Sequence, residues 1–260
     1  MARLPVVGQD EDNWGGILNE FLLVAHNEDG TLKNGSSSSG IGVYSAVVYI
    51  DDTSVIAKDY KGDTIASGTA GTDDASVIQS ALDNLTSERT WYEKVVLFGS
   101  FIANQKISIP NWTIVELIGA IKLADDVNDF LFTNKDTTSP SHITIKGGYY
   151  DGNKANQSSP ADALLYFDGV NDLVLSDLFI ENPCNRGIEL VGWGQRTILN
   201  NMSIINPTLH GIGMGTVQQV RANNIYIYGA GEYAIVASCV RSVFTNIISR
   251  KCARGFELAY

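Results

Sequence analysis

Two carboxylates are the residues whose types and spacing fit bond-breaking chemistry in this 260-residue sequence. Hydrolysis of a glycosidic bond needs two carboxyl groups, about 5–5.5 Å apart for retention of configuration or about 6.5–9.5 Å apart for inversion. Asp168 and Glu189 fit the second distance if they lie on neighbouring strands, because an offset of two residues then separates them by roughly 8 Å. Glu257 would lie three strands beyond Glu189, about 14 Å away and too far for a pair. We therefore predict Asp168 and Glu189 as the catalytic carboxylates.

Four basic or aromatic residues come just before consecutive predicted strands, and they are Arg186, His210, Tyr233 and Arg254. On strands about 4.8 Å apart they would form a ladder. Arginine binds carboxylates through paired hydrogen bonds, and an aromatic ring offers an apolar face to a sugar. The ladder therefore predicts binding of an anionic polysaccharide, although ordinary polar residues at strand entrances fit the pattern equally well. His210 beside Arg186 is an alternative acid–base pair, suited to a lyase.

An internal repeat indicates how these residues are arranged. One segment recurs at 176–183, 200–207, 223–229 and 245–249. A second segment recurs in step at 187–190, 211–214, 234–237 and 255–258. The spacings are 24, 23 and 21–22 residues, and apolar residues alternate within each segment, as in β-strands. A period of this length without the leucine-rich-repeat pattern predicts an all-β, right-handed parallel β-helix with three short strands per turn.

One position of the repeat holds residues that tolerate a positive φ angle. It is occupied by Asp177, Asn201, Asn224 and Asn246, and by Gly147 in the preceding turn. Asp, Asn and Gly adopt the left-handed conformation at the lowest cost. We therefore predict a sharp turn at this position in every turn of the helix, with asparagine side chains hydrogen-bonded from one turn to the next.

The two ends of the predicted β-helix differ. Residues 72–82 combine a capping residue with a 3.6-residue apolar period, which predicts a short amphipathic helix. Such a helix would cover apolar side chains and strand edges at the open end of the stack. Residues 256–260 stop in the middle of a turn, so we expect either that the chain is a fragment or that another element covers this end.

Composition excludes several classes of function. A formal charge of -11 and a pI of about 4.6 argue against a nucleic-acid partner. No run of 18 apolar residues occurs, which predicts no membrane insertion, and the start lacks the apolar stretch of a signal peptide. Three cysteines without a CxxC spacing and three scattered histidines predict no metal and no cofactor. A calcium site at Asp151 and Asn153 is the alternative to a plain Asp-Gly turn there.

Three motifs resemble the pectate-lyase-like parallel β-helix proteins. They are GTDDASVIQSALD at 71–83, IPNWTI at 109–114 and GGYYDGNK at 147–154. This family includes polysaccharide lyases, glycoside hydrolases and virus tailspikes, so the resemblance is specific for the fold rather than for one reaction. It implies a ligand groove along the Gly-Ile-Glu-Leu strands. The glycan-binding residues would then be Tyr166, Arg186, His210, Tyr233, Arg254 and Glu257.

The first forty residues carry a second resemblance. Residues 13–22 and 26–33 are similar to a segment at the front of phage tail fibre and tailspike proteins. One apolar stripe of a short helix would contain Trp14, Leu18, Phe21 and Leu22. A helix this short must dock, either on the protein's own body or on a virion. We predict an anchor at 1–35, a linker with short strands at 36–60 and the β-helix at 61–260.

The two resemblances together imply a virus tail appendage, located in the virion. It would be a homotrimer that binds a tail or baseplate protein through residues 1–35 and host surface polysaccharide through the β-helix. Outward residues such as Val236 and Tyr228 would pack between subunits. Three alternatives stay open: a receptor-binding protein without catalysis, a depolymerase acting through Asp168 and Glu189, and a cellular protein, extracellular or on the cell surface, that binds or degrades polysaccharide.

Overall fold

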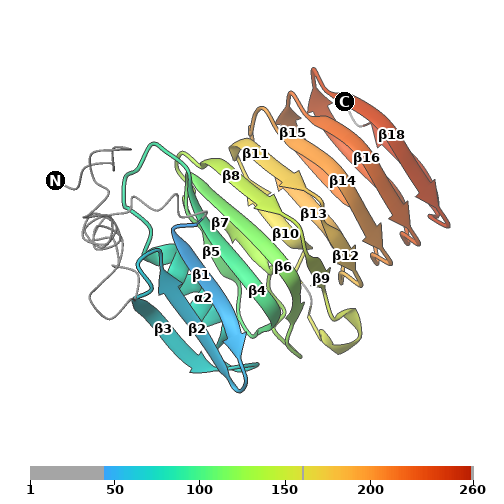
Figure 1. Ribbon diagram of the computed structural model, residues 1–260. Helices are drawn as coiled ribbons and strands as arrows, with labels where there is room; N and C mark the ends of the chain where they lie inside the picture. The colour runs from blue at the N-terminus through green and yellow to red at the C-terminus, as the bar shows by residue number, and fades with distance from the viewer. Residues whose placement is uncertain (1–43, 160, 259–260) are drawn as a thin grey trace, which may run out of the picture. The chain divides into compact units, whose positions relative to one another are not determined.

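The protein folds as a parallel β-helix, which confirms the predicted all-β class. The structure, a computed structural model, describes residues 44–159 and 161–258. The predicted anchor at 1–35, with Trp14, Leu18, Phe21 and Leu22, lies outside the described residues. Figure 1 shows the strands side by side in steps, from β1 at the blue end to β18 at the red end.

Two sheets build the coil, and every strand pair from β4 onward is parallel. The first sheet contains β1 (Ala46–Asp51), β2 (Ser54–Asp59), β3 (Thr64–Thr69), β4 (Glu93–Ala103), β6 (Thr113–Leu123), β8 (Ser141–Lys146), β9 (Tyr149–Asp151), β11 (Asn171–Ser176), β12 (Phe179–Glu181), β14 (Ile198–Ile205), β16 (Arg221–Tyr228) and β18 (Val243–Arg250). The second sheet contains β5 (Ile107–Ile109), β7 (Phe132–Asn134), β10 (Ala163–Asp168), β13 (Arg186–Val191), β15 (Ile212–Gln218), β17 (Tyr233–Val240) and β19 (Arg254–Leu258). A 3-10 helix, η1 (Lys154–Asn156), follows β9.

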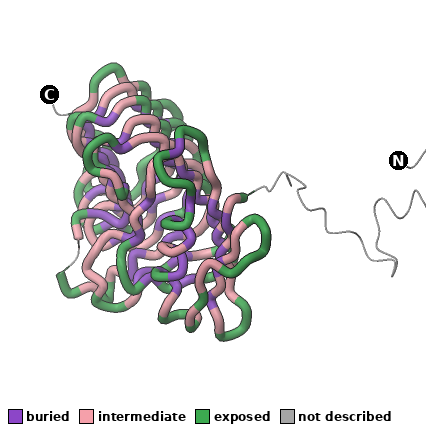
Figure 2. The backbone as a smooth tube through the Cα atoms, turned by 90° about the vertical axis from the view of Figure 1, so that its left-hand side faces the viewer, coloured by how far each residue is buried: buried purple, intermediate pink, exposed green. Residues whose placement is uncertain are grey.

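The sequence repeat sets the register of the strands. Leu175 pairs with Leu199, and Leu199 pairs with Ala222. All three side chains are buried inside the coil, because alternate residues of a strand point to the same face. Figure 2 shows this pattern along the coil: buried residues recur in each turn up to β17, and exposed residues gather at the loops.

The predicted asparagine ladder is present. Asp177, Asn201, Asn224 and Asn246 have φ angles of 61°, 53°, 55° and 50°. Each asparagine donates its side-chain amide to the residue one turn earlier, at 2.7, 2.8 and 2.9 Å. Gly147, with a φ of 71°, holds the same position in the preceding turn. The ladder joins successive turns along one corner of the coil.

A second corner of the coil repeats the positive-φ conformation, here mostly in residue types that rarely adopt it. Positive φ angles of 54–59° occur within two residues of the start of successive strands of the first sheet, at Trp112, His142, Asp172, Arg196, Gln219 and Arg241. The strand registers align these positions in one column. The rings of Trp112 and His142 stack 3.5 Å apart within it. This corner was not predicted, because its residues are mostly not Asn, Asp or Gly.

Helix α2 (Asp74–Asp83) forms where residues 72–82 predicted a helix, and it packs against β1 to β5. Asp73 occupies the N-cap position but makes no side-chain cap hydrogen bond. The buried carboxylate of Asp74 instead accepts hydrogen bonds from the backbone N–H groups of Gly71 and Ile102, at 2.9 and 2.7 Å. Asp74 therefore ties the helix to β4.

The range predicted as linker and short strands contains β1 and β2, which form an antiparallel hairpin. β1 also pairs in parallel with β4, so this hairpin extends the first sheet. Among the described residues, no helix is both long and apolar enough to cross a membrane.

Candidate functional site

The predicted ladder lies in register along the second sheet. Arg186 pairs with Ala163, and the Gly187 N–H donates to the carbonyl of His210 at 3.2 Å. Tyr233 pairs with Arg254 on the next strand. The Arg254 guanidinium donates to the Tyr233 hydroxyl at 2.7 Å and lies 5.0 Å from its ring centre. Arg254 and Tyr233 thus form an exposed, preassembled pair at one end of the ladder.

His210 is a supporting residue of this ladder rather than an exposed ligand. It is 8% exposed, and its Nδ1 accepts a hydrogen bond from the Tyr233 N–H at 3.4 Å. Burial lowers the pKa of His210, and the nearby Arg186 lowers it further against the opposing effects of Glu232 and Glu257. The imidazole is therefore neutral near pH 7, in the state that can accept this hydrogen bond.

Glu189 is the most perturbed carboxyl of the predicted site. It points outward from β13 between the buried Ile188 and Leu190, and its side chain is 15% exposed. Its Oε2 forms an ion pair with the Nε of Arg186 at 3.0 Å, and Oε2 is buried without a hydrogen-bond partner among the described residues. Burial raises the pKa of Glu189, whereas Arg186 lowers it. A carboxyl group with a raised pKa suits a proton donor.

A glycine on the next strand makes room for this carboxyl group. Gly213 pairs with Glu189, and a Cβ atom added at Gly213 would lie 2.0 Å from the Glu189 Oε2. Real side-chain atoms do not approach that closely, so any other residue at this position would displace Glu189 or its neighbour Arg186. Gly213 is therefore a positioning residue that the sequence reasoning did not identify as such.

The second predicted carboxylate, Asp168, lies on the neighbouring strand and is exposed. Asp168 pairs with Val191, so it is offset from Glu189 by two residues, as predicted. A Cβ atom at Gly192 would lie 2.4 Å from the Asp168 Oδ1, which shows that this carboxylate leans toward the loop after β13. The pairing of Asp168 with Glu189 in catalysis stays a prediction.

Tyr166 lies on the same strand as Asp168 and pairs directly with Glu189 on the next strand. Its ring stacks on Phe130 with centres 4.4 Å apart. Burial raises the pKa of Tyr166, and the nearby Asp168, Glu189 and Asp162 raise it further. The hydroxyl group is therefore held in its protonated, hydrogen-bond-donating form among acidic groups.

Glu257 lies at the far end of the same face. It pairs with Val236, which pairs with Gly213, so it is three strands from Glu189, as the repeat predicted. No group of three His, Cys, Asp or Glu side chains that could hold a metal occurs within residues 44–159 and 161–258. Asp151 accepts the N–H of Asn153 at 2.9 Å, and Asn153 has a φ of 49°, which is the geometry of a turn.

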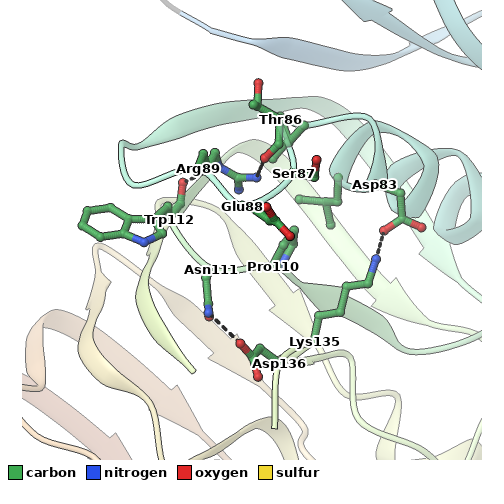
Figure 3. Close-up of a pocket in the computed structure, with 12 residues that line it drawn as sticks. Asp83, Thr86, Ser87, Glu88, Arg89, Pro110, Asn111, Trp112, Lys135 and Asp136 are labelled. Atoms are coloured by element: carbon green, nitrogen blue, oxygen red, sulfur yellow. Dashed lines mark hydrogen bonds and ion pairs between the residues drawn. The ribbon is translucent and has the colours of Figure 1, made fainter. Parts of the chain in front are cut away.

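A cavity of about 470 Å³ lies beside the end of α2, at residues that the sequence did not single out. Figure 3 shows two pairs of polar side chains in it: Lys135 with Asp83, at 2.8 Å, and Asn111 with Asp136, at 2.9 Å. Arg89 donates to the carbonyls of Thr86 and Trp112. Lys135 thus holds the end of α2, and Arg89 holds the loop after it, against the coil. Among the lining residues, these pairings leave no pair of free carboxyl groups in the cavity.

Comparison with family models finds no match, and no curated protein sequence matches the chain. A crystal structure from Parabacteroides merdae, of a protein provisionally classed as a glycosyl hydrolase, matches with a TM-score of 0.56 and 15% identity over 68% of this chain and 88% of that one. The A-module of a mannuronan C-5 epimerase from Azotobacter vinelandii gives a TM-score of 0.49 and 17% identity, over 71% of this chain and 54% of that one. At these identities the first likeness supports the fold alone: the chain shares the parallel β-helix of that protein.

Proposed function

We propose that the protein binds an acidic polysaccharide along the ladder of the second sheet. The observation that carries this proposal is the in-register column in which Arg186, Tyr233 and Arg254 offer two charged donors and an aromatic ring, while the buried His210 supports Tyr233. Arginine pairs with carboxylates through charge-assisted hydrogen bonds. A linear polymer with one acidic group per sugar would meet such donors repeatedly along the coil. The Parabacteroides likeness agrees with a polysaccharide as ligand.

Cleavage of the polysaccharide is the second candidate function. It is favoured by Glu189, whose burial raises its pKa and leaves Oε2 without a hydrogen-bond partner among the described residues. Glu189 would donate a proton to the leaving oxygen, and Asp168 would activate a water from the other side. Arg186 would hold a substrate carboxylate beside this pair.

The finer hypothesis is that the chain is a homotrimeric virus tail appendage. Its support is the resemblance of residues 13–33 to tail proteins, a segment outside the described residues. The alternative, an extracellular or cell-surface protein that binds or degrades polysaccharide, agrees equally with the ladder. Light scattering separates a trimer, of three times 28.1 kDa, from a monomer. Binding of residues 1–35 to a tail or baseplate protein would support the virion role, and its absence would favour the cellular one.

Binding is tested by titration calorimetry with polygalacturonate, and with dextran as a neutral control. We expect wild-type protein to bind polygalacturonate and not dextran, and the double variant Arg186→Ala/Arg254→Ala to bind at least about tenfold more weakly. Arg250→Ala removes an exposed arginine from the other sheet and should leave the affinity nearly unchanged. Equal loss in both variants, or binding of dextran, would exclude the ladder as an acidic-glycan site.

Cleavage is tested by the release of reducing ends from the same polymer. We expect Glu189→Gln and Asp168→Asn to abolish release while binding is retained. Gly213→Ala should lower release strongly, because its methyl group displaces the Glu189 carboxyl. Binding without any release by the wild-type protein would leave the protein an adhesin. Full release by Glu189→Gln would assign the catalytic acid elsewhere.

A further inference from the structure

A groove of about 650 Å³ lies on the first sheet, away from the ladder. It runs along the corner where the chain enters β11, β14, β16 and β18, which lie side by side in Figure 1. Three arginines from consecutive turns line it, namely Arg196, Arg221 and Arg241. Among its lining residues Asp172 alone is acidic. The groove is therefore basic on a protein whose total charge is -11.

The positive-φ corner aligns the charged residues of the groove. Asp172, Arg196, Gln219 and Arg241 occupy one column of successive turns, and Arg221 lies two residues after Gln219. Three steps between strands give the column a length of about 14 Å. The groove is thus elongated along the coil axis, and its charged groups are spaced by whole turns.

One arginine of the groove is already paired, and two are free. Arg196 donates two hydrogen bonds to the carboxylate of Asp172, at 2.6 and 2.7 Å. His142 approaches the same carboxylate at 3.5 Å. Arg221 and Arg241 are exposed, and neither side chain makes an ion pair or hydrogen bond within the part of the chain that the structure describes. Two guanidinium groups therefore remain available to a ligand.

The surroundings of the groove strengthen its positive potential. Residues 190–258 contain six basic residues and only two acidic ones, Glu232 and Glu257. Both acidic residues are on the side of the ladder, and neither lines the groove. Clustered charge of one sign attracts a ligand of the opposite sign even on a protein of opposite net charge.

The walls between the arginines are apolar or aromatic. Ile198 and Val243 are exposed on either side of Arg221 in the strand register, and Val174 lies one turn before Ile198. Tyr92 closes one end, with its ring 6.0 Å from that of His142. Alternation of apolar surface with arginine suits a chain of sugar rings that carries anionic groups, because the rings have apolar faces.

From these contacts we infer a second binding site, separate from the ladder, at which Arg221 and Arg241 bind the carboxylate or sulfate groups of an acidic polysaccharide. Tyr92 and Ile198 contact its sugar rings, and Asp172 holds Arg196 in place at the edge of the groove. The site adds to the proposed function, because a polymer could be bound on two faces of the coil at once. Its failure would leave the ladder untouched, since the two sites share no residue.

The test uses the full chain in a background where the ladder carries Arg186→Ala/Arg254→Ala. Arg221→Ala/Arg241→Ala is compared with Arg250→Ala/Lys251→Ala, which removes the same charge from the same segment outside the groove. Polygalacturonate, dextran sulfate and single-stranded DNA are titrated into each protein. Circular dichroism and melting curves confirm that all variants fold.

We expect the groove variant to lose at least about tenfold in affinity for polygalacturonate or dextran sulfate, and the control variant to lose less than about twofold. Tighter binding of polygalacturonate assigns carboxylates to the site, and tighter binding of dextran sulfate assigns sulfates. Equal losses in the two variants, or no loss in the groove variant, would overturn the site. Binding of DNA as tight as that of either glycan would also overturn the assignment to polysaccharide.

Discussion

The turns before residue 190 and the turns after it share one strand register, but they differ in the side chains that fill the core and in charge. The four largest fully buried side chains, which are the aromatic rings of Phe101, Phe132, Tyr150 and Phe167, all precede residue 190. The buried core after residue 190 is aliphatic, with residues such as Ile212, Met214 and Ala237. Charge changes at the same point, since residues 190–258 carry six basic and two acidic residues in a chain of net charge -11. The asparagine ladder and the second positive-φ corner thus keep the strand register the same in both regions, while the core residues and the surface charge differ.

The largest effect should come from the aromatic filling of the earlier turns. Phe132→Ala leaves a cavity in the core and should lower the free energy of unfolding by about 3–5 kcal/mol, measured by urea denaturation. Ile143→Val and Ile235→Val, one in each region, should both cost about 0.5–1.5 kcal/mol. If Phe132→Ala lowered the free energy of unfolding no more than these two controls do, the aromatic side chains of the earlier turns would not contribute extra stability.

The next effect concerns the end of the earlier region, which α2 covers. Asp74→Ala removes a buried carboxylate that accepts two backbone N–H groups, and should cost about 2–3 kcal/mol in the same assay. Asp73→Ala removes one exposed hydrogen bond, to the Thr69 N–H, and should cost about 1 kcal/mol. The reverse order would show that Asp73, at the N-cap position, stabilises this end of the coil more than Asp74 does.

A smaller effect concerns the asparagine ladder of the later region. Asn224→Ala breaks two side-chain hydrogen bonds and places a Cβ-bearing residue without a local hydrogen bond at a φ of 55°, which should cost about 2 kcal/mol. Asn224→Gly breaks the same bonds but accepts the positive φ, so it should cost about 1 kcal/mol less than alanine. Equal costs for alanine and glycine would assign the whole effect to the hydrogen bonds and none to the backbone.

The repeat in the sequence was sufficient to predict the strands, their register and the asparagine ladder. Each of these follows from residue types that recur in step, because the left-handed turn selects Asn, Asp or Gly. The second corner escaped prediction since Trp112, Arg196 and Gln219 carry no such signal, and only the constant spacing of turns reveals it. The role of Asp74 in tying α2 to the sheet could not be predicted, because its carboxylate accepts a hydrogen bond from the N–H group of Ile102, which is distant in the sequence.

The candidate site was predictable only as columns of residues. The repeat placed Arg186, Tyr233 and Arg254 in one ladder, as the structure has them. It did not reveal that His210 is buried, nor that Glu189 leans over Gly213, because both depend on how side chains pack between turns. The basic groove could not be predicted from the arginines alone, because the second positive-φ corner is what aligns them.

The smallest effect is a pH dependence at the boundary between the two regions, where two carboxylates should act with opposite sign. Burial raises the pKa of Glu189, so the folded protein keeps this proton to a higher pH than the unfolded chain does. Its contribution to stability is fully present below the ordinary glutamate pKa and is lost as the pH rises through the raised value. The Arg196 hydrogen bonds lower the pKa of Asp172, whose contribution is present above the ordinary aspartate pKa and is lost as the pH falls through the lowered value.

Melting temperatures of wild type, Glu189→Gln and Asp172→Asn between about pH 3 and pH 7 check these signs, because each amide variant removes one titration. The advantage of wild type over Asp172→Asn should grow as the pH rises. Relative to Glu189→Gln, wild type should lose stability over the same range. A parallel trend in both comparisons would mean that Arg186 outweighs burial at Glu189, and that this carboxyl is a structural ion pair instead of a proton donor. In that case Glu189 would be a charged carboxylate stabilised by Arg186, and it would no longer support the proposed cleavage.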